Sequence, residues 1–146
     1  MIKLLIVCRG NTCRSPMAEY ILRNMLEKTG QSDFHVVSAG THKGSILTAS
    51  VHEILTAHGI KHDSKRPAQS IDDLQLNEFD QILVMDNGVK NDVLAKIADA
   101  DVRAKVKLFL DDAEVSDPYG QDKTIYEETY QIIHRGCVSI IEGTTT

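Results

Sequence analysis

The residues from Val7 to Pro16 constrain this chain more than any others, because they join a strand to a helix through a tight loop. The apolar run Ile2–Val7 comes before the loop and is typical of a parallel strand that is buried on both faces. Residues 16–26 follow with apolar side chains at helical spacing, and Ser15 and Pro16 suit the N-cap and the first helical position. Because parallel α/β sheets bind ligands at the carboxyl ends of their strands, we expect the site in this loop.

The chemistry of the loop favours a tetrahedral anion. Helix-terminal amides attract anions, and Gly10 permits a turn whose amides point inward. The same positive field favours a thiolate, so we expect Cys8 to be one near neutral pH. Arg14 lies six residues later and can bind two phosphate oxygens with its planar guanidinium. A nucleophile, an amide cradle and a guanidinium together predict attack on a phosphate ester through a cysteinyl-phosphate intermediate.

Motifs at opposite ends of the chain resemble the low-molecular-weight protein tyrosine phosphatases. Cys8 is followed after five residues by Arg14-Ser15, and Asp117-Pro118-Tyr119 lies near the C-terminus. Segments 38–41 and 85–86 match strand ends of that family, and all the motifs keep the family's order. The resemblance implies a flavodoxin-like three-layer α/β fold, with a four-stranded parallel sheet of order 2-1-3-4 and helices on both faces.

The resemblance also implies the roles of three residues in a protein tyrosine phosphatase. Cys8 is the nucleophile, Arg14 binds the phosphate, and Asp117 protonates the leaving oxygen and then activates water. By itself, Asp117-Pro118 is the pattern of an ordinary turn. Segment 111–114 offers other carboxylates, but none of them precedes a proline.

Further residues complete the predicted site for the phosphate and its substituent. They are Arg9, Gly10, Asn11, Thr12, Cys13, Ser15 and Tyr119. By resemblance, the Ser15 hydroxyl supports the Cys8 sulfur as a leaving group, Asn11 shapes the loop with Ser38, and Tyr119 forms one wall for an aromatic substrate. Asn11 also suits a left-handed turn.

The sequence leaves two interpretations open for several polar residues. Arg9 is expected at the rim of the site, either solvated or bound to acidic substrates. Cys13 is either a structural thiol or the partner of Cys8 in a reversible disulfide that protects Cys8 from irreversible oxidation. His58 and His62 are interpreted as exposed histidines, although some members of the family place a histidine near the Asn11 network.

Thr12 makes the substrate class an open question. Most tyrosine-specific relatives carry Ile at this position, whereas a related branch that acts on phosphoarginine tends to carry Thr. The aromatic residue usual after segment 38–41 is also missing, because His42-Lys43-Gly44 has no large ring. We predict a protein tyrosine phosphatase, with a protein arginine phosphatase as the alternative.

Other classes of function fit the sequence less well. A metal site would use Cys8 with Cys13 and His134 with Cys137, but the arginines beside the first pair disfavour a cation. A thioredoxin-coupled arsenate reductase needs two more cysteines near the third strand, and residues 80–99 contain none. A non-catalytic phosphate-binding module would have to lack a general acid. We therefore predict no metal and no cofactor, and we expect Cys137 in the core.

Composition sets the remaining expectations. The 146 residues, 42% apolar and 25% charged, suit a single domain over residues 1–146. The net charge of −5 does not favour a nucleic acid partner, and no apolar run is long enough to span a membrane. Three cysteines and no signal peptide suggest a cytoplasmic protein, which we expect to be a monomer that binds phosphorylated proteins. Residues 1–29 carry five cationic and two acidic side chains, either to attract that substrate or as a solvated helix face.

Apolar periodicity predicts the other elements. Beyond the first strand and helix, strands are expected at 34–39, 79–85 and 106–110. Helices are expected from Thr48 or Ser50 to His58, over 89–97 and over 124–141, and Ser70 is expected to cap a short helical turn. The alternation of strands and helices predicts right-handed βαβ units around a parallel sheet.

Overall fold

Strand β1 (Ile2–Cys8) lies inside the sheet because its side chains are apolar toward both faces. A computed structural model describes residues 1–145, and in it Leu4 to Val7 are fully buried. Strand β1 pairs in parallel with β2 (Phe34–Gly40) on one side and β3 (Gln81–Val84) on the other. Strand β4 (Val106–Leu108) pairs with β3. The order β2-β1-β3-β4 confirms the predicted sheet.

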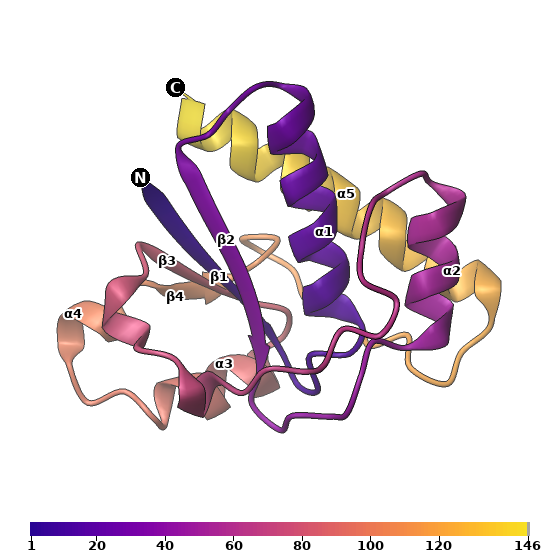
Figure 1. Ribbon diagram of the computed structural model, residues 1–146. Coiled ribbons are helices and arrows are strands. Elements are labelled where there is room, and N and C mark those ends of the chain that lie inside the picture. The colour runs from indigo at the N-terminus through magenta and orange to yellow at the C-terminus, as the bar shows by residue number, and fades with distance from the viewer. Residues whose placement is uncertain (146) are drawn as a thin grey trace.

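Helices cover the two faces of this sheet unequally (Figure 1). On one side lie α1 (Arg14–Lys28), α2 (Ala49–Ala57) and the long helix α5 (Lys123–Thr145). On the other side lie α3 (Asn87–Leu94) and the short α4 (Ala100–Arg103). The three-layer arrangement with a parallel sheet confirms the predicted fold class.

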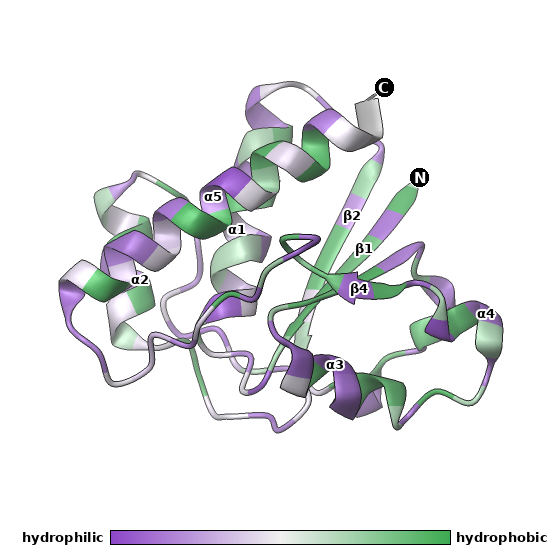
Figure 2. Cartoon of the chain, turned by 180° about the vertical axis from the view of Figure 1, so that it is seen from behind, coloured by the Kyte–Doolittle hydropathy of each residue, from purple (hydrophilic) through white to green (hydrophobic). Residues whose placement is uncertain are grey.

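Two apolar cores form because successive side chains of a strand point to opposite faces. Leu4 and Ile6 join the core with α1, α2 and α5, whereas Leu5 and Val7 join the core with α3 and α4. Figure 2 shows the mainly hydrophobic strands between helices that carry polar residues on their outer sides. The carboxyl end of β1 is thus clamped between two packed layers, which fixes where the following loop begins.

The predicted elements are present, with differences at their ends. Strand β4 stops at Leu108, and Asp111 turns the chain with a positive φ of 71°. The short turn at 71–73 is a 3₁₀ helix whose Ser70 hydroxyl accepts a hydrogen bond from the Asp72 amide, as predicted. A second 3₁₀ turn at Leu76–Glu78 and helix α4 were not predicted.

The N-cap prediction for Ser15 is wrong. Helix α1 already begins at Arg14, Cys13 occupies the N-cap position, and no side chain caps the helix. The Ser15 hydroxyl instead points inward and lies 3.0 Å from the Cys8 sulfur.

None of the helices within residues 1–145 is both long enough and apolar enough to cross a membrane.

Candidate active site

The loop between β1 and α1 wraps around the Cys8 sulfur. Cys8 is the last residue of β1 and is 2% exposed. Asn11 adopts the left-handed conformation with a φ of 55°, which brings its backbone N–H to 3.3 Å from the Cys8 sulfur. The side chains of Asn and Asp tolerate this conformation better than most others, because they are short and polar. The left-handed turn that the sequence left open as an alternative for Asn11 is therefore present.

Segment 41–48 holds the loop from outside. The carbonyl oxygens of Cys8, Arg9, Gly10 and Thr12 accept hydrogen bonds from the amides of residues 41, 42, 44 and 48, at 2.7 to 3.2 Å. The two backbones approach so closely that a Cβ on Gly40 would lie 2.7 Å from the Arg9 carbonyl oxygen. Because these loop carbonyls are engaged on the outside, they do not present negative dipoles to an anion inside the loop.

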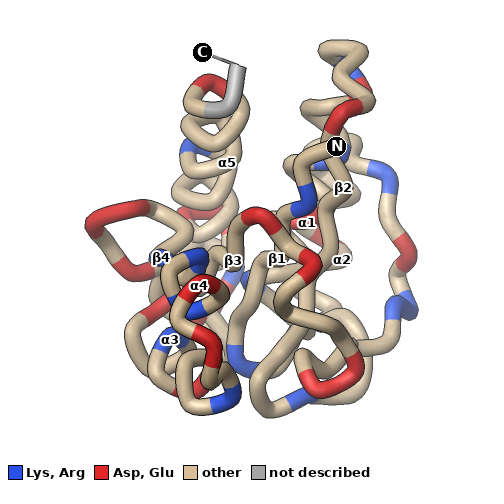
Figure 3. The backbone as a smooth tube through the Cα atoms, turned by 90° about the vertical axis from the view of Figure 1, so that its left-hand side faces the viewer, with Lys and Arg blue, Asp and Glu red and all other residues tan. Residues whose placement is uncertain are grey.

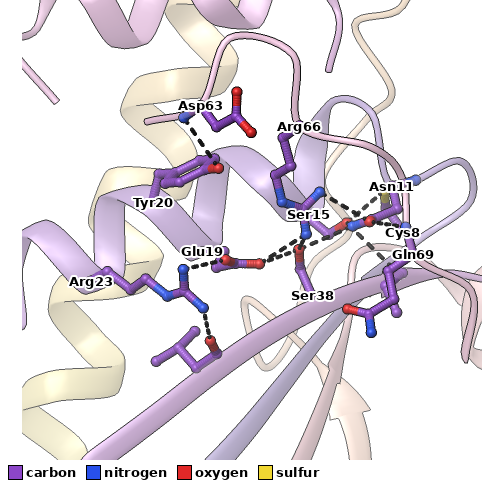
Figure 4. A network of polar contacts seen from close by, with 12 residues as sticks. Cys8, Asn11, Ser15, Glu19, Tyr20, Arg23, Ser38, Asp63, Arg66 and Gln69 are labelled. Carbon is purple, nitrogen blue, oxygen red and sulfur yellow. Dashed lines mark hydrogen bonds and ion pairs between the residues drawn. The ribbon is translucent and has the colours of Figure 1, made fainter. Parts of the chain in front are cut away.

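A buried polar network supports the loop from the side of β2 (Figure 4). The Asn11 side-chain amide donates to the hydroxyls of Ser15 and Ser38, at 2.8 and 3.0 Å. The expected Asn11–Ser38 hydrogen bond is thus confirmed. The Asn11 side-chain oxygen accepts from the guanidinium of Arg66 at 3.1 Å and from the Gln69 amide at 2.8 Å. Every polar atom of the Asn11 side chain is therefore bonded.

Two charged residues of this network were not predicted from the sequence. Glu19 is 3% exposed, accepts from the Ser38 hydroxyl at 2.6 Å and forms ion pairs with Arg23 at 2.8 Å and Arg66 at 3.1 Å. One signal pointed to Glu19: it lies four residues after Ser15 and so on the same helix face. Nothing local in the sequence pointed to Arg66, which is 55 residues from Asn11.

Arg14 is locked in place before any ligand binds. Its Nη1 donates to the Asp86 carboxylate at 2.8 Å and to the Val115 carbonyl at 2.7 Å, and its side chain is 3% exposed. Burial lowers the pKa of Arg14, but the hydrogen bond to Asp86 and the charges of Cys8, Asp117 and Asp86 outweigh it and raise the pKa. The guanidinium is therefore a permanent cation with a fixed orientation.

Asp86 was predicted only as part of a strand end that matches the family. It caps α3 by accepting from the Val89 amide at 2.8 Å, and its other oxygen binds Arg14. Burial raises the pKa of Asp86, but the hydrogen bonds from Arg14 and the Val89 amide, together with the Arg14 charge, bring the pKa below its ordinary value.

Asp117 approaches the site from the segment between β4 and α5. One carboxylate oxygen lies 3.8 Å from Nη2 of Arg14, and the other accepts from the Tyr119 amide at 3.0 Å. Its side chain is 48% exposed and Tyr119 is 68% exposed, so both residues border open solvent.

Cys8, Arg14 and Asp117 line one cavity of about 930 Å³. Of the other predicted residues, Arg9, Gly10, Thr12, Cys13 and Tyr119 line it too. Ile46 is also in the lining and is 50% exposed, so an aliphatic side chain stands on the wall that lacks the expected aromatic ring. Another cavity of about 600 Å³ lies between β4 and α5 and includes none of the predicted site residues.

Cys13 is a buried thiol of the same loop. It is 5% exposed and lies close to the Tyr126 hydroxyl of α5. Burial and the nearby charges of Cys8 and Asp117 raise the pKa of Cys13 to about 12, against the smaller opposite effects of Tyr126 and Arg14. Cys8 and Cys13 are both unpaired, so the reversible disulfide stays a prediction.

The two histidines lie outside the Asn11 network, but only His58 is exposed as interpreted from the sequence, whereas His62 is half-buried. His58 is paired with Glu127 at 2.8 Å. The His62 ring bonds through Nε2 to Nδ1 of His52 at 2.8 Å and through Nδ1 to the Ile60 carbonyl at 2.7 Å. His52 lines the cavity, so this histidine pair belongs to its α2 wall.

Residues 1–145 hold no group of three His, Cys, Asp or Glu side chains that is arranged to bind a metal. Cys137, a member of the alternative metal set, is fully buried and donates weakly to the Ala18 carbonyl at 3.7 Å. It belongs to the core, as expected.

The chain is similar to known proteins over almost its whole length. A family profile described as "Low molecular weight phosphotyrosine protein phosphatase" matches residues 3–144. The low molecular weight protein-tyrosine-phosphatase YfkJ of Bacillus subtilis is 34% identical over 97% of this chain and 94% of its own length.

Solved structures give the same result. A low molecular weight phosphotyrosine phosphatase from Vibrio cholerae O395 is 32% identical, with a TM-score of 0.89 over 99% of this chain and 97% of that one. The arginine phosphatase YwlE of Geobacillus stearothermophilus has a TM-score of 0.85 over 99% of this chain and 94% of that one. At 21% identity, the second likeness shows a common fold alone.

Proposed function

Because this chain belongs to the low molecular weight phosphotyrosine protein phosphatase family, we propose that it hydrolyses phosphotyrosine in protein substrates through a cysteinyl-phosphate intermediate. The observation that carries the proposal is the convergence of Cys8, Arg14 and Asp117 on one cavity. These three side chains supply the nucleophile, the anion binder and the general acid that the reaction requires.

In the first step, the Cys8 sulfur attacks phosphorus and the bond from phosphorus to the tyrosine oxygen breaks. The departing oxygen takes a proton from Asp117, whose exposed carboxyl borders the cavity. Arg14 binds two of the phosphoryl oxygens. Asp86 and the Val115 carbonyl anchor its Nη1. The guanidinium therefore needs little reorganisation when charge develops on the phosphoryl group in the transition state.

In the second step, the Asp117 carboxylate takes a proton from a water molecule that attacks phosphorus, and the bond from phosphorus to sulfur breaks. Phosphate leaves, and Cys8 regains its original state. The Ser15 hydroxyl at 3.0 Å and the Asn11 amide at 3.3 Å support the departing sulfur, because hydrogen bonds to a thiolate favour the charged form.

The substitution Cys8→Ser tests the nucleophile. We expect turnover of phosphotyrosine to fall to background, while inorganic phosphate still binds in calorimetry because the amides and Arg14 remain. Arg14→Lys is the companion variant: it should lose most of its activity and bind phosphate weakly, since a point charge replaces a bidentate donor. Substantial turnover by Cys8→Ser would disprove the mechanism.

We propose an arginine phosphatase as the second candidate, on the strength of Thr12. Thr12 lines the cavity, and its methyl group packs beside Gly44, where a Cβ would lie only 2.8 Å away. A threonine leaves more room above the phosphorus than isoleucine does, and its hydroxyl can bond to a polar guanidino group.

Thr12→Ile tests this second candidate. We predict that the ratio of kcat/KM for phosphotyrosine to that for phosphoarginine rises by roughly 10- to 200-fold, the range for a change of one methylene in a pocket. Thr12→Val is the matched control, because it removes the hydroxyl and keeps the shape. If the wild type and both variants are inert toward phosphoarginine, or if neither variant changes the ratio, Thr12 does not select the substrate.

We further propose that the enzyme acts as a monomer in the cytoplasm. All of the proposed catalytic groups come from one chain, and the three cysteines are unpaired, as is usual in a reducing compartment. Light scattering at catalytic concentrations measures the mass, and a dimer would contradict the first part of this proposal.

A further inference from the structure

The rim of the active-site cavity differs in charge from the protein as a whole. The chain has a net charge of −5, yet the cavity lining contains Arg9, Arg14 and Lys65 and only one carboxylate, Asp117. Acidic residues are frequent elsewhere, notably in segment 111–114 after β4, as the colouring of the backbone in Figure 3 shows. The cationic character of the rim is therefore local.

Arg9 and Lys65 come to this rim from separate parts of the chain. Arg9 follows the nucleophile directly in the phosphate loop. Lys65 lies between α2 and β3, in a segment that is tied to the cavity wall. Two backbone hydrogen bonds of 2.9 Å make this link, from the Leu47 amide to the Arg66 carbonyl and from the Ala68 amide to the Ser45 carbonyl.

Two other cations at the site already have acidic partners. Arg14 binds Asp86, and Arg66 binds Glu19. Within residues 1–145, neither Arg9 nor Lys65 has a carboxylate within 4 Å of its charged nitrogens. The carboxylate closest in sequence to Lys65, that of Asp63, accepts the backbone amide of Lys65 at 2.9 Å. Both side chains are exposed, so they are available to a ligand.

We propose that Arg9 and Lys65 bind acidic side chains on either side of the phosphorylated residue, so that the preferred substrates are acidic phosphopeptides. This inference rests on the proposed phosphatase function and deepens it. The exposed Ile46 in the same lining adds an apolar contact for the peptide. Because exposed ion pairs are weak, each cation contributes a preference of only about two- to fivefold at low ionic strength.

The test compares two phosphotyrosine peptides that differ only in their flanks. One carries glutamate at the three positions on each side, and the other carries glutamine, which has the same shape without the charge. For the wild type at low salt, the ratio of kcat/KM for the acidic peptide to that for the neutral peptide should be about 4 to 25, and salt should bring it close to 1.

Lys65→Gln and Arg9→Gln should each lower this ratio by about two- to fivefold, and the double variant should bring it near 1. Lys28→Gln is the matched control, because it removes the same charge from the exposed far end of α1. A general loss of activity lowers kcat/KM for both peptides equally and so cancels in the ratio. This includes a loss caused by a disturbed phosphate loop in Arg9→Gln.

A wild-type ratio near 1 at low salt would overturn this inference, as would equal decreases in Lys65→Gln and Lys28→Gln. Free phosphotyrosine separates the two proposals. If the wild type does not hydrolyse it, the proposed function fails. If it does and the flanks have no effect, only the inference about acidic substrates fails.

Discussion

Asp117 performs two proposed tasks from one position. It faces the Arg14 guanidinium at 3.8 Å, yet its side chain is half exposed and its second oxygen is held by the Tyr119 amide. A carboxyl group between a buried cation and open solvent can give a proton to a leaving oxygen and later take one from water. This position is consistent with a proposed acid that comes from a surface segment rather than from the sheet.

Asp117→Asn separates the catalytic role from a structural one. We predict a loss in kcat of roughly a hundredfold or more for phenyl phosphate, a poor leaving group, since general acid catalysis contributes about 10²–10⁴-fold. The loss should be smaller for p-nitrophenyl phosphate, whose leaving oxygen needs less protonation. Asp112→Asn, an exposed neighbour in the same segment, is the control. Equal losses for both esters would mean that Asp117 is only structural.

At the scale of elements, the Arg66–Glu19 pair connects segments that lie far apart in the sequence. It joins the segment after α2 to helix α1, and both residues bond to Ser38 of β2. Asn11, which lies in the loop between β1 and α1, bonds to the same Arg66 guanidinium. The loop is therefore supported on the side of β2 by the charged groups of Arg66 and Glu19, and from outside by segment 41–48.

We predict that Arg66→Met lowers the free energy of unfolding by up to about 3 kcal/mol. This is the lower end of the range for breaking a buried ion pair, because Glu19 keeps its partner Arg23. Arg23→Met is the control and should cost about 1 kcal/mol or less, since the Arg23 side chain is 49% exposed. Urea unfolding measures both values, and equal losses would argue against a special role for Arg66.

At the scale of the whole molecule, local sequence patterns predict the fold well. They predict poorly the charged residues that hold the active-site loop in place. Some segments could be predicted because each is one continuous stretch of sequence. They are the apolar runs at Ile2–Val7 and 34–39 and the loop between Cys8 and Arg14. Glu19 and Arg66 are charged residues that, taken alone, indicate solvated surface. Only the packing of α1 against β2 and the return of the chain after α2 bring them together.

The N-cap prediction for Ser15 was wrong for a related reason, whereas the expected contact of its hydroxyl with the Cys8 sulfur is present. A serine before a proline at the start of a helix is typical of a cap, and the local pattern contains nothing else. The tertiary structure offers this hydroxyl a sulfur at 3.0 Å and an amide donor at 2.8 Å, and these contacts replace the cap.

Asp86 links three layers of the molecule, so its ionisation should affect global stability. Its pKa is lowered in the folded state, which means that the folded protein binds this proton less readily than the unfolded chain does. The stabilisation is therefore present above the ordinary pKa of about 3.8 and is lost as the pH falls through the lower, folded pKa.

We predict that Asp86→Asn is less stable than the wild type at pH 6 and that this difference shrinks below about pH 3.8. Urea unfolding at a series of pH values measures it. Asp80→Asn, which removes a carboxylate that accepts only a backbone amide in the described structure, controls for the general effect of acid. A difference that stays constant down to pH 2 would contradict the assignment.

The paired rings of His52 and His62 have a consequence for the wall of the cavity. The Ile60 carbonyl can only accept, so Nδ1 of His62 carries a hydrogen. Nε2 of His62 and Nδ1 of His52 are 2.8 Å apart, and only one hydrogen fits between them. The tautomers of the two imidazoles are thus tied together, and full protonation of both would break the contact. With both rings neutral, His52 therefore donates from Nδ1 and presents Nε2 as a hydrogen-bond acceptor on the wall of the cavity.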